Sequence, residues 1–221
     1  MNQVEISAIE CYRRAWQRIK RNFLYLVALC LIANLISSLS NGILSGVMIC
    51  SMFAACLDVM DNENPDTSFR KLFAGFSYFL PSLLLVIIAS IPIFITVILL
   101  FAITPLLSSI DSSRQLVLKV WMSVVFIAVV STICLHSLMI FSFPLVVDKN
   151  MSALESILVS SQAVWSNLGL VVNVLLISFL LSIIGLLACC IGVYFVFPIN
   201  LAVITFIYRQ IFPAGRYEPG T

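Results

Sequence analysis

Long apolar runs alternate with short polar segments along the chain. The runs cover residues 23–39, 41–57, 76–107, 117–143, 168–187 and 192–211. Runs of about 17 or more apolar residues are typical of membrane-spanning helices, and these runs lack the period-two alternation of membrane β-barrel strands. The pattern predicts an all-α, polytopic transmembrane helical bundle of about six spans. Residues 23–57 form either two short spans or one re-entrant hairpin, and both alternatives return the chain to the same side.

The run at 76–107 is interrupted by Pro81, Pro92 and Pro105. Proline kinks a helix because it removes a backbone hydrogen bond, yet membrane spans tolerate it. We therefore expect one long, bent span here.

Two segments have the spacing of amphipathic helices. In residues 3–21, one face collects apolar and aromatic side chains, and the other collects most of the basic ones. The apolar set is Ile9, Tyr12, Trp16, Ile19 and Phe23. In residues 151–166 the apolar set is Met151, Leu154, Ile157, Leu158 and Trp165. Such helices suit the membrane–water interface, so we expect both to lie on the cytoplasmic membrane surface.

The two amphipathic segments also resemble one another in sequence. Aligned at a constant offset, Ser7, Ala8, Glu10, Asn22 and Val27 recur as Ser152, Ala153, Glu155, Asn167 and Val172. We interpret this as a parallel internal repeat within one integral membrane domain, 1–221. Unit 1 is 1–57, a middle loop and hairpin is 58–143, unit 2 is 144–212, and 213–221 is a flexible tail. We interpret residues 67–76 as a degenerate third elbow before the middle hairpin.

Composition and charge agree with a membrane protein. Hydrophobic residues make up 62% of the chain and charged residues only 10%, against about 25% in soluble domains. Ten of the twelve Lys and Arg residues fall at the N-terminus, in the 58–71 loop, near 149 and in the tail, and the other two are Arg114 and Lys119. The positive-inside rule predicts a multi-pass protein of the bacterial inner membrane with both termini cytoplasmic.

The sequence offers no enzyme chemistry. It has no nucleophile–base pair, no HExxH and no phosphate-binding loop. The seven cysteines form no CxxC spacing, and most act as small hydrophobes inside apolar runs. We expect no catalytic residue, no cofactor, no metal ion and no nucleic-acid partner.

Four polar residues are candidates for function. His136 is the only histidine and lies within a predicted span, where it is either functional or hydrogen-bonded between helices. Glu10 and Glu155 occupy matching repeat positions, where they pair with basic residues or face solvent. Asp148 is expected to act as an N-cap-like start of the second amphipathic helix.

Two further groups of residues suggest contacts with lipid or with another helix. The interfacial set comprises Arg13, Arg14, Trp16, Arg18, Lys20, Arg21 and Trp165, and its basic members are suited to anionic lipid. Gly42, Gly46 and Cys50 belong to a row of small residues at spacing four. That row lets helices approach closely, in a dimer seam or within the bundle.

Three stretches, "SFRKLFAGF", "FPLVVDKNMSALESILVSSQAVWSN" and "GVYFVFPINLAVITFIYRQIF", give the chain a resemblance to a known family. It resembles a bacterial family of uncharacterised six-span integral membrane proteins related to the membrane domain of glycerophosphodiester phosphodiesterase. The resemblance implies a fold and a membrane location without catalysis.

We therefore expect a non-catalytic inner-membrane protein that organises or senses the bilayer or scaffolds a partner. Its partners would be membrane lipids, a second copy or another membrane protein. The alternative is a small-solute or lipid transporter.

Overall fold

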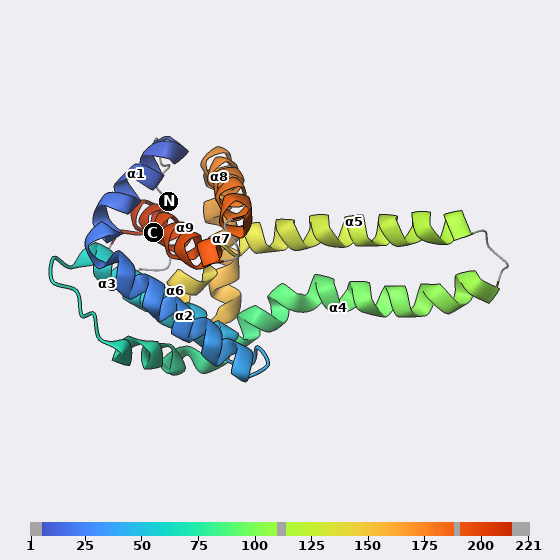
Figure 1. Ribbon diagram of the computed structural model, residues 1–221, viewed down its shortest axis with the longest axis horizontal. Coiled ribbons are helices and arrows are strands. Elements are labelled where there is room, and N and C mark those ends of the chain that lie inside the picture. Colours follow the sequence, from blue (N-terminus) through green and yellow to red (C-terminus); the bar gives the residue numbers. More distant parts are fainter. Residues whose placement is uncertain (1–5, 110–113, 188–190, 214–221) are drawn as a thin grey trace.

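The computed structural model describes residues 6–109, 114–187 and 191–213 (Figure 1). These residues form helices and connecting turns, with no β-strand among them, which confirms the predicted all-α class. In chain order the elements are α1 (Ala8–Ile19), η1 (Lys20–Asn22), α2 (Phe23–Leu39), α3 (Ser45–Asp61), η2 (Phe69–Tyr78), α4 (Phe79–Ser109), α5 (Arg114–Leu138), α6 (Ser142–Lys149), α7 (Ala153–Ser166), α8 (Leu168–Leu187) and α9 (Ile191–Ile211). The elements labelled η are 3-10 helices.

Five helical segments in the described part of the chain are long and apolar enough to cross a membrane. They are Ala8–Leu39, Phe69–Pro105, Gln115–Lys149, Leu168–Leu187 and Gly192–Ile211. The structure is therefore compatible with a multi-pass membrane protein. The remaining predicted span, 41–57, corresponds to α3, which begins only at Ser45 and is largely buried inside the protein. The predicted 76–107 span is one continuous helix, α4, which contains Pro92 and Pro105.

The helices form three hairpins, α2–α3, α4–α5 and α8–α9, and a short surface helix precedes each of them. These surface helices are α1, η2 and α7. Each packs against the last helical segment, here called the closing segment, of another hairpin. Helix α1 packs against α9, η2 packs against α3, and α7 packs against α6. Helix α6 counts as the closing segment of the α4–α5 hairpin because it follows α5 after a break at 139–141. This cyclic exchange of contacts links the three hairpins into one bundle.

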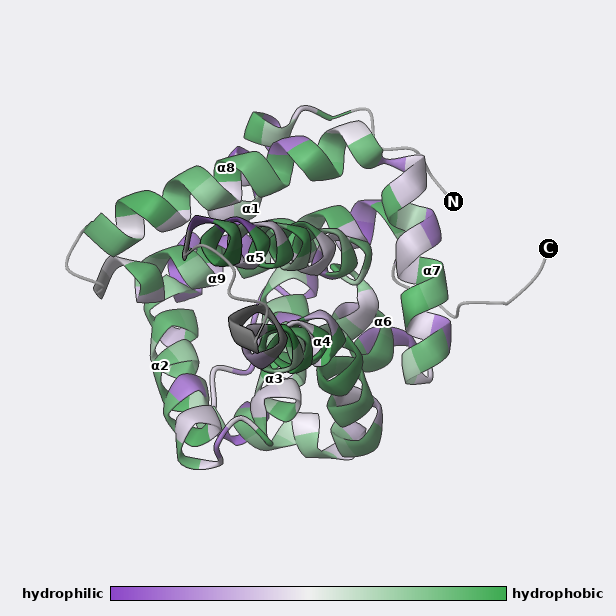
Figure 2. Ribbon diagram, turned by 90° about the vertical axis from the view of Figure 1, so that its right-hand side faces the viewer, coloured by the Kyte–Doolittle hydropathy of each residue, from purple (hydrophilic) through white to green (hydrophobic). Residues whose placement is uncertain are grey.

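The hairpins point in different directions. In Figure 1 the α4–α5 hairpin extends far from the rest of the molecule. Figure 2 looks down this hairpin and shows α8 running across the view, with most residues of α4, α5 and α8 hydrophobic. These helices expose large apolar side chains such as Phe94, Phe126 and Phe179, which is what a lipid environment requires of them.

Close helix contacts around α3 depend on glycine. A Cβ added at Gly46 would lie 2.5 Å from the carbonyl oxygen of Ser82 in α4, and one added at Gly75 of η2 would overlap the Val47 carbonyl oxygen of α3. The predicted small-residue row is thus divided. Gly46 and Cys50 are buried within the bundle, whereas Gly42 lies in the α2–α3 turn with φ +84°. The hypothesis that these residues form one dimer seam is wrong for Gly42, because Gly42 lies in a turn and does not share a helix face with Gly46 and Cys50.

The two surface helices α1 and α7 begin in the same way. The Oγ of Ser7 accepts a hydrogen bond from the Glu10 N–H at 3.3 Å, and the Oγ of Ser152 accepts one from the Glu155 N–H at 3.4 Å. The Glu155 carboxylate in turn accepts from the Ser152 N–H at 3.3 Å, which completes a capping box. Ser152 is therefore the N-cap of the second helix. The predicted N-cap role of Asp148 is wrong, because Asp148 lies near the end of α6.

Both surface helices bury mainly small residues and leave most of their large apolar residues exposed. The buried positions of α1 are Ala8, Cys11, Ala15 and Ile19, and those of α7 are Ala153, Ser156, Ser160, Ala163 and Val164. The exposed large residues include Ile9, Trp16, Leu154, Leu158 and Trp165. Small side chains allow close packing on the bundle, and the large apolar side chains remain available to the membrane interface.

Candidate functional site

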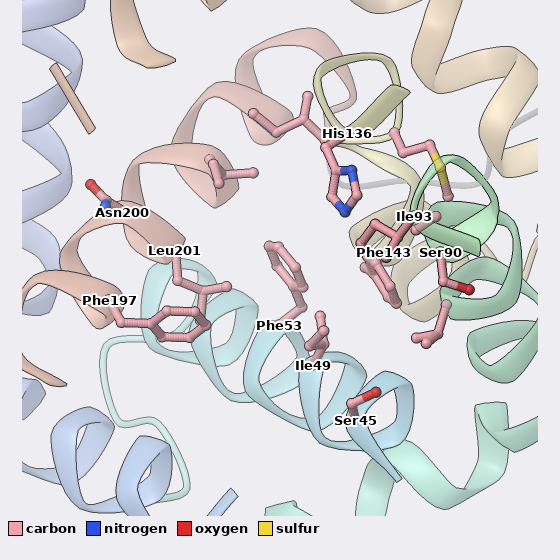
Figure 3. A pocket seen from close by; sticks show the side chains of 15 residues that line it. Ser45, Ile49, Phe53, Ser90, Ile93, His136, Phe143, Phe197, Asn200 and Leu201 are labelled. Atoms are coloured by element: carbon pink, nitrogen blue, oxygen red, sulfur yellow. The ribbon is translucent and has the colours of Figure 1, made fainter. Parts of the chain in front are cut away.

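A cavity of about 440 Å³ lies between α3, α4, the α5–α6 junction and α9 (Figure 3). Most of its lining is apolar, with Ile49 and Phe53 from α3, Ile93 from α4, Phe143 from α6, and Phe197 from α9. Ligand cavities of about 300–1,000 Å³ that combine an apolar lining with a few polar groups are typical small-molecule sites. This cavity, named here the apolar groove, is our candidate functional site.

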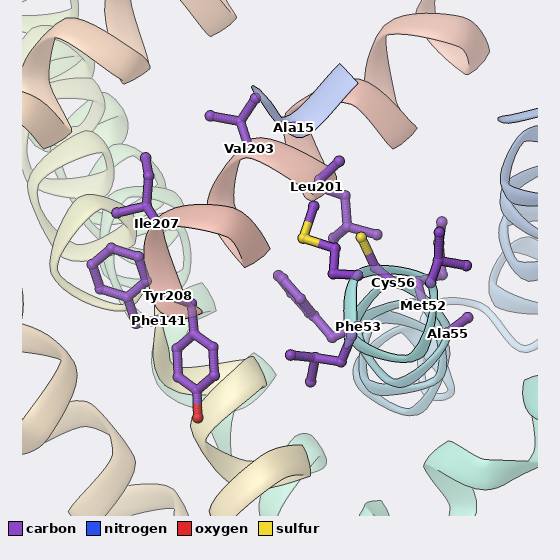
Figure 4. Packing of buried hydrophobic residues seen from close by; sticks show 14 of the residues in the cluster. Ala15, Met52, Phe53, Ala55, Cys56, Phe141, Leu201, Val203, Ile207 and Tyr208 are labelled. Atoms are coloured by element: carbon purple, nitrogen blue, oxygen red, sulfur yellow. The ribbon is translucent and has the colours of Figure 1, made fainter. Parts of the chain in front are cut away.

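The wall of the groove formed by α3 and α9 belongs to the packed core. Phe53 and Leu201 line the groove and also pack in the main cluster of buried hydrophobic residues, together with Met52, Cys56 and Tyr208 (Figure 4). Densely packed interiors resist deformation. The α3–α9 wall therefore provides a rigid surface, whereas α4 and α5 on the other side have few buried side chains.

The polar groups that line the groove are Ser45, Ser90, His136 and Asn200. The Ser45 hydroxyl donates to the Gly42 carbonyl oxygen at 2.6 Å, and the Ser90 hydroxyl donates to the Ile87 carbonyl oxygen at 2.8 Å. His136 Nδ1 lies 2.9 Å from the carbonyl oxygen of Thr132 in the same helix. Among the described residues, His136 therefore bonds within its own helix, and the interhelical hydrogen bond that was one of its two predicted roles is not formed there.

The end of α5, on which His136 lies, is fixed by Ser160 of α7. At the break between α5 and α6, the Ser160 hydroxyl donates to the Leu138 carbonyl oxygen at 2.6 Å and accepts from the Phe141 N–H at 3.1 Å. A broken helix leaves backbone groups without intrahelical partners, and Ser160 satisfies two of them. This serine therefore holds the junction that forms one side of the groove.

A second set of side-chain hydrogen bonds connects three helices beside the groove. The Tyr12 hydroxyl of α1 donates to Asn200 Oδ1 of α9 at 3.1 Å and lies 2.7 Å from the hydroxyl of Ser178 in α8. Since the Tyr12 proton goes to Asn200, Ser178 donates to the Tyr12 oxygen. These contacts join the first surface helix to the last hairpin.

The ends of α3, α6 and α9 meet in an ion-pair cluster made of Asp61, Asp148, Tyr208 and Arg209. The Arg209 guanidinium bonds both Asp148 oxygens at 2.8 Å and contacts Asp61 Oδ2 at 2.5 Å. The Tyr208 hydroxyl also donates to Asp148, at 2.8 Å. Bidentate arginine–carboxylate pairs are among the strongest side-chain contacts. The cluster thus joins one closing segment from each hairpin at the same end of the molecule.

Sequence reasoning assigned Arg209 to the tail and overlooked this cluster. The available signal was one arginine inside the apolar stretch "FIYRQIF", which requires a carboxylate partner if it is not in water. A neighbouring segment reinforces the cluster, since Arg18 of α1 donates to the Met60 carbonyl oxygen at 3.0 Å.

The remaining residues of the interfacial set belong neither to the groove nor to the ion-pair cluster. Arg13 and Arg14 both bind Glu10, at 2.8 and 2.7 Å, so Glu10 pairs with basic residues while Glu155 caps its own helix. Lys20 and Arg21 in η1 are exposed. Trp16 packs edge-on against Phe23 with ring centroids 5.0 Å apart. Trp165 is exposed on α7.

The loop after α3 is ordered by Asp58. Its carboxylate forms a salt bridge with Lys71 and accepts hydrogen bonds from Asn62 at 2.6 Å and from the Asp66 N–H at 2.9 Å. Burial favours the neutral form of Asp58, but the hydrogen bonds from Lys71 and Asn62 outweigh it and hold the pKa of this carboxyl below its usual range. This loop is therefore attached firmly to the end of α3.

Metal-ligating residues do not gather anywhere in the described part of the chain. Of the cysteines there, Cys11, Cys30, Cys50 and Cys56 are buried and Cys134 is exposed; the vicinal pair at 189 and 190 lies outside the described residues. No family model, curated protein or solved structure matches this chain, so its function is inferred from its own residues.

Proposed function

We propose that this chain is a non-catalytic, multi-pass protein of the bacterial inner membrane that binds lipid, and that it organises or senses the bilayer in this way. The observation that carries the proposal is the apolar groove of about 440 Å³. It lies among helices of predominantly hydrophobic residues (Figure 2), and α4 and α5 expose large apolar side chains on their other faces. In a membrane, lipid chains are the most abundant molecules able to fill such a space.

A six-span arrangement with both termini in the cytoplasm is part of the proposal. The ends of α3, α6 and α9 meet in the ion-pair cluster, and α1 contributes Arg18 to the same region. Charged groups of this kind are stable near a membrane surface and costly at its centre. These four segments therefore share one side, and the excess of Lys and Arg around them favours the cytoplasmic side.

The internal repeat is also part of the proposal, extended to three units. Buried positions 8, 11, 15 and 19 of α1 precede buried positions 153, 156, 160 and 164 of α7 by the same offset that aligns their sequences. The equivalent capping serines, Ser7 and Ser152, support the same alignment. Because η2 likewise precedes a hairpin and packs on the preceding one, we take η2–α4–α5 as the third unit.

Lipid binding is tested with a variant that fills the groove. Ala89→Phe on α4 places a ring in the cavity, whereas Ala102→Phe makes the same change at an exposed position of the same helix. Each protein is purified in mild detergent, and retained lipid is identified by native mass spectrometry. We expect the parent and Ala102→Phe proteins to retain lipid and Ala89→Phe to lose it. Equal retention by all three proteins would contradict the proposal.

Lipid transport is the second candidate function. It is favoured by the position of the groove against α4 and α5, whose other faces are exposed and apolar. A lipid chain leaving the groove on that side would enter the bilayer without crossing polar protein surface. A lipid-translocation assay in reconstituted vesicles separates the two functions, since only a transporter exchanges lipid between leaflets faster than protein-free vesicles do.

A further inference from the structure

The polar side chains that face the groove retain hydrogen-bond acceptors only. The hydroxyl protons of Ser45 and Ser90 are donated to the backbone, at 2.6 and 2.8 Å. A serine oxygen in this state still has lone pairs but has no second proton to donate. Neither serine can therefore donate to a molecule in the groove without breaking its own hydrogen bond.

His136 is an acceptor by the same reasoning. A carbonyl oxygen can only accept, so the contact of 2.9 Å to the Thr132 oxygen places the hydrogen on Nδ1. In the neutral imidazole, Nε2 then has a free lone pair. Figure 3 shows the ring extending into the cavity, where this nitrogen is available to a ligand.

Asn200, the fourth polar group, does not supply the missing donor. Figure 3 shows its amide pointing away from the cavity, and its Oδ1 is occupied by the Tyr12 hydroxyl. Among the described residues, no lysine or arginine lines the groove. A phosphate or carboxylate in this space would lose its water and gain no side-chain donor, which is costly for an anion.

We infer that the groove takes a lipid whose head group is uncharged and carries a hydroxyl, and that His136 Nε2 accepts the hydrogen bond from that hydroxyl. This inference rests on the proposed lipid-binding function and narrows its ligand class. The apolar residues Ile49, Phe53 and Phe197 surround the hydrocarbon portion. An acceptor within an apolar site discriminates strongly, because an analogue without the donor leaves the acceptor unpaired.

Three probes with the same acyl chains test the inference: dioleoylglycerol, its methyl ether, which lacks the hydroxyl proton, and dioleoyl phosphatidic acid. Binding to the purified parent protein is measured by native mass spectrometry with each probe in turn. We expect dioleoylglycerol to bind about tenfold more tightly than its methyl ether, as one lost hydrogen bond requires, and phosphatidic acid to bind more weakly still.

The variant His136→Phe keeps a ring in the groove and removes the acceptor. It should bind dioleoylglycerol and the methyl ether equally, while Ala102→Phe keeps the preference of the parent. Tighter binding of phosphatidic acid, or no preference for the hydroxyl in the parent protein, would overturn the inference, and the parent measurement decides even if His136→Phe does not fold. If the parent protein does not prefer the hydroxyl but Ala89→Phe still abolishes lipid binding, the lipid-binding proposal stands and only the head-group assignment fails. If Ala89→Phe changes nothing, the proposed function fails as well.

Discussion

Replacement of Arg209 should destabilise the protein more than replacement of any exposed basic residue. The Arg209 side chain is only 14% exposed, and its partners Asp148 and Asp61 are 15% and 32% exposed. In Arg209→Gln, two carboxylates remain close together without their cation. One of them, Asp148, keeps the Tyr208 hydroxyl and its neighbour Lys149 at 3.3 Å, whereas Asp61 loses its only described ion pair.

The loss of stability expected for Arg209→Gln is smaller than the loss on breaking a fully buried ion pair. Removing one partner of a fully buried ion pair costs about 3–5 kcal/mol, and partial solvent access at Asp61 reduces this. We expect a loss of about 2–4 kcal/mol in the free energy of unfolding. At about 2–4 °C per kcal/mol for a chain of this size, the melting temperature should fall by about 5–15 °C.

Buried thiols provide the assay. Cys11, Cys30, Cys50 and Cys56 are buried, so a thiol-reactive fluorogenic dye reports unfolding in detergent as temperature rises. Arg13→Gln is the control, because the Arg13 side chain is 69% exposed and Arg14 still pairs with Glu10; its effect should stay below about 0.5 kcal/mol. A melting temperature for Arg209→Gln as close to the parent as that of Arg13→Gln would refute the structural role of the cluster.

Three further changes test other contacts. Gly75→Ala should destabilise the protein by about 1–3 kcal/mol because the new methyl group overlaps the α3 backbone, whereas Gly169→Ala, with no atom within 4 Å of the new methyl, should be neutral or stabilising in the same dye assay. The lowered pKa of Asp58 in the folded protein gives stability that is present above about pH 4 and is lost as pH falls further; unfolding midpoints measured from pH 6 to pH 3 should therefore fall less for Asp58→Asn than for the parent. Tyr12→Phe should cost about 1–2 kcal/mol, since it removes two hydrogen bonds between helices, and an unchanged melting temperature would contradict that role.

Helix positions were predictable because the strongest local signal, the length of an apolar run, dictates them. The runs at 168–187 and 192–211 match α8 and α9 to within a residue. The run at 41–57 predicted the start of its helix less accurately, because Ser40, Asn41 and Gly42 form a turn with positive φ at Asn41 and Gly42. That turn delays the start of α3 to Ser45. An apolar run alone does not reveal a turn built from small and polar residues.

The groove and the ion-pair cluster depend on tertiary contacts that the sequence does not encode locally. His136 was recognisable as a polar residue in a span, but the break after α5 that places it at a cavity is stabilised by Ser160, 22 residues from Leu138. Arg209 and Asp148 are 61 residues apart. The spacing of one helix cannot indicate which distant carboxylate an arginine will bind.

The placement of the chain in the membrane is tested most directly by single added cysteines labelled with a membrane-impermeant thiol reagent in intact cells. Asn64→Cys lies in the exposed loop between α3 and η2, and Gln115→Cys lies at the exposed start of α5. Labelling above that of the unmodified chain is measured before and after lysis. We expect the cysteine at 115 to react from outside and the cysteine at 64 to react only after lysis. Reaction of both positions from outside, or of neither before lysis, would contradict a hairpin that crosses the membrane from a cytoplasmic base.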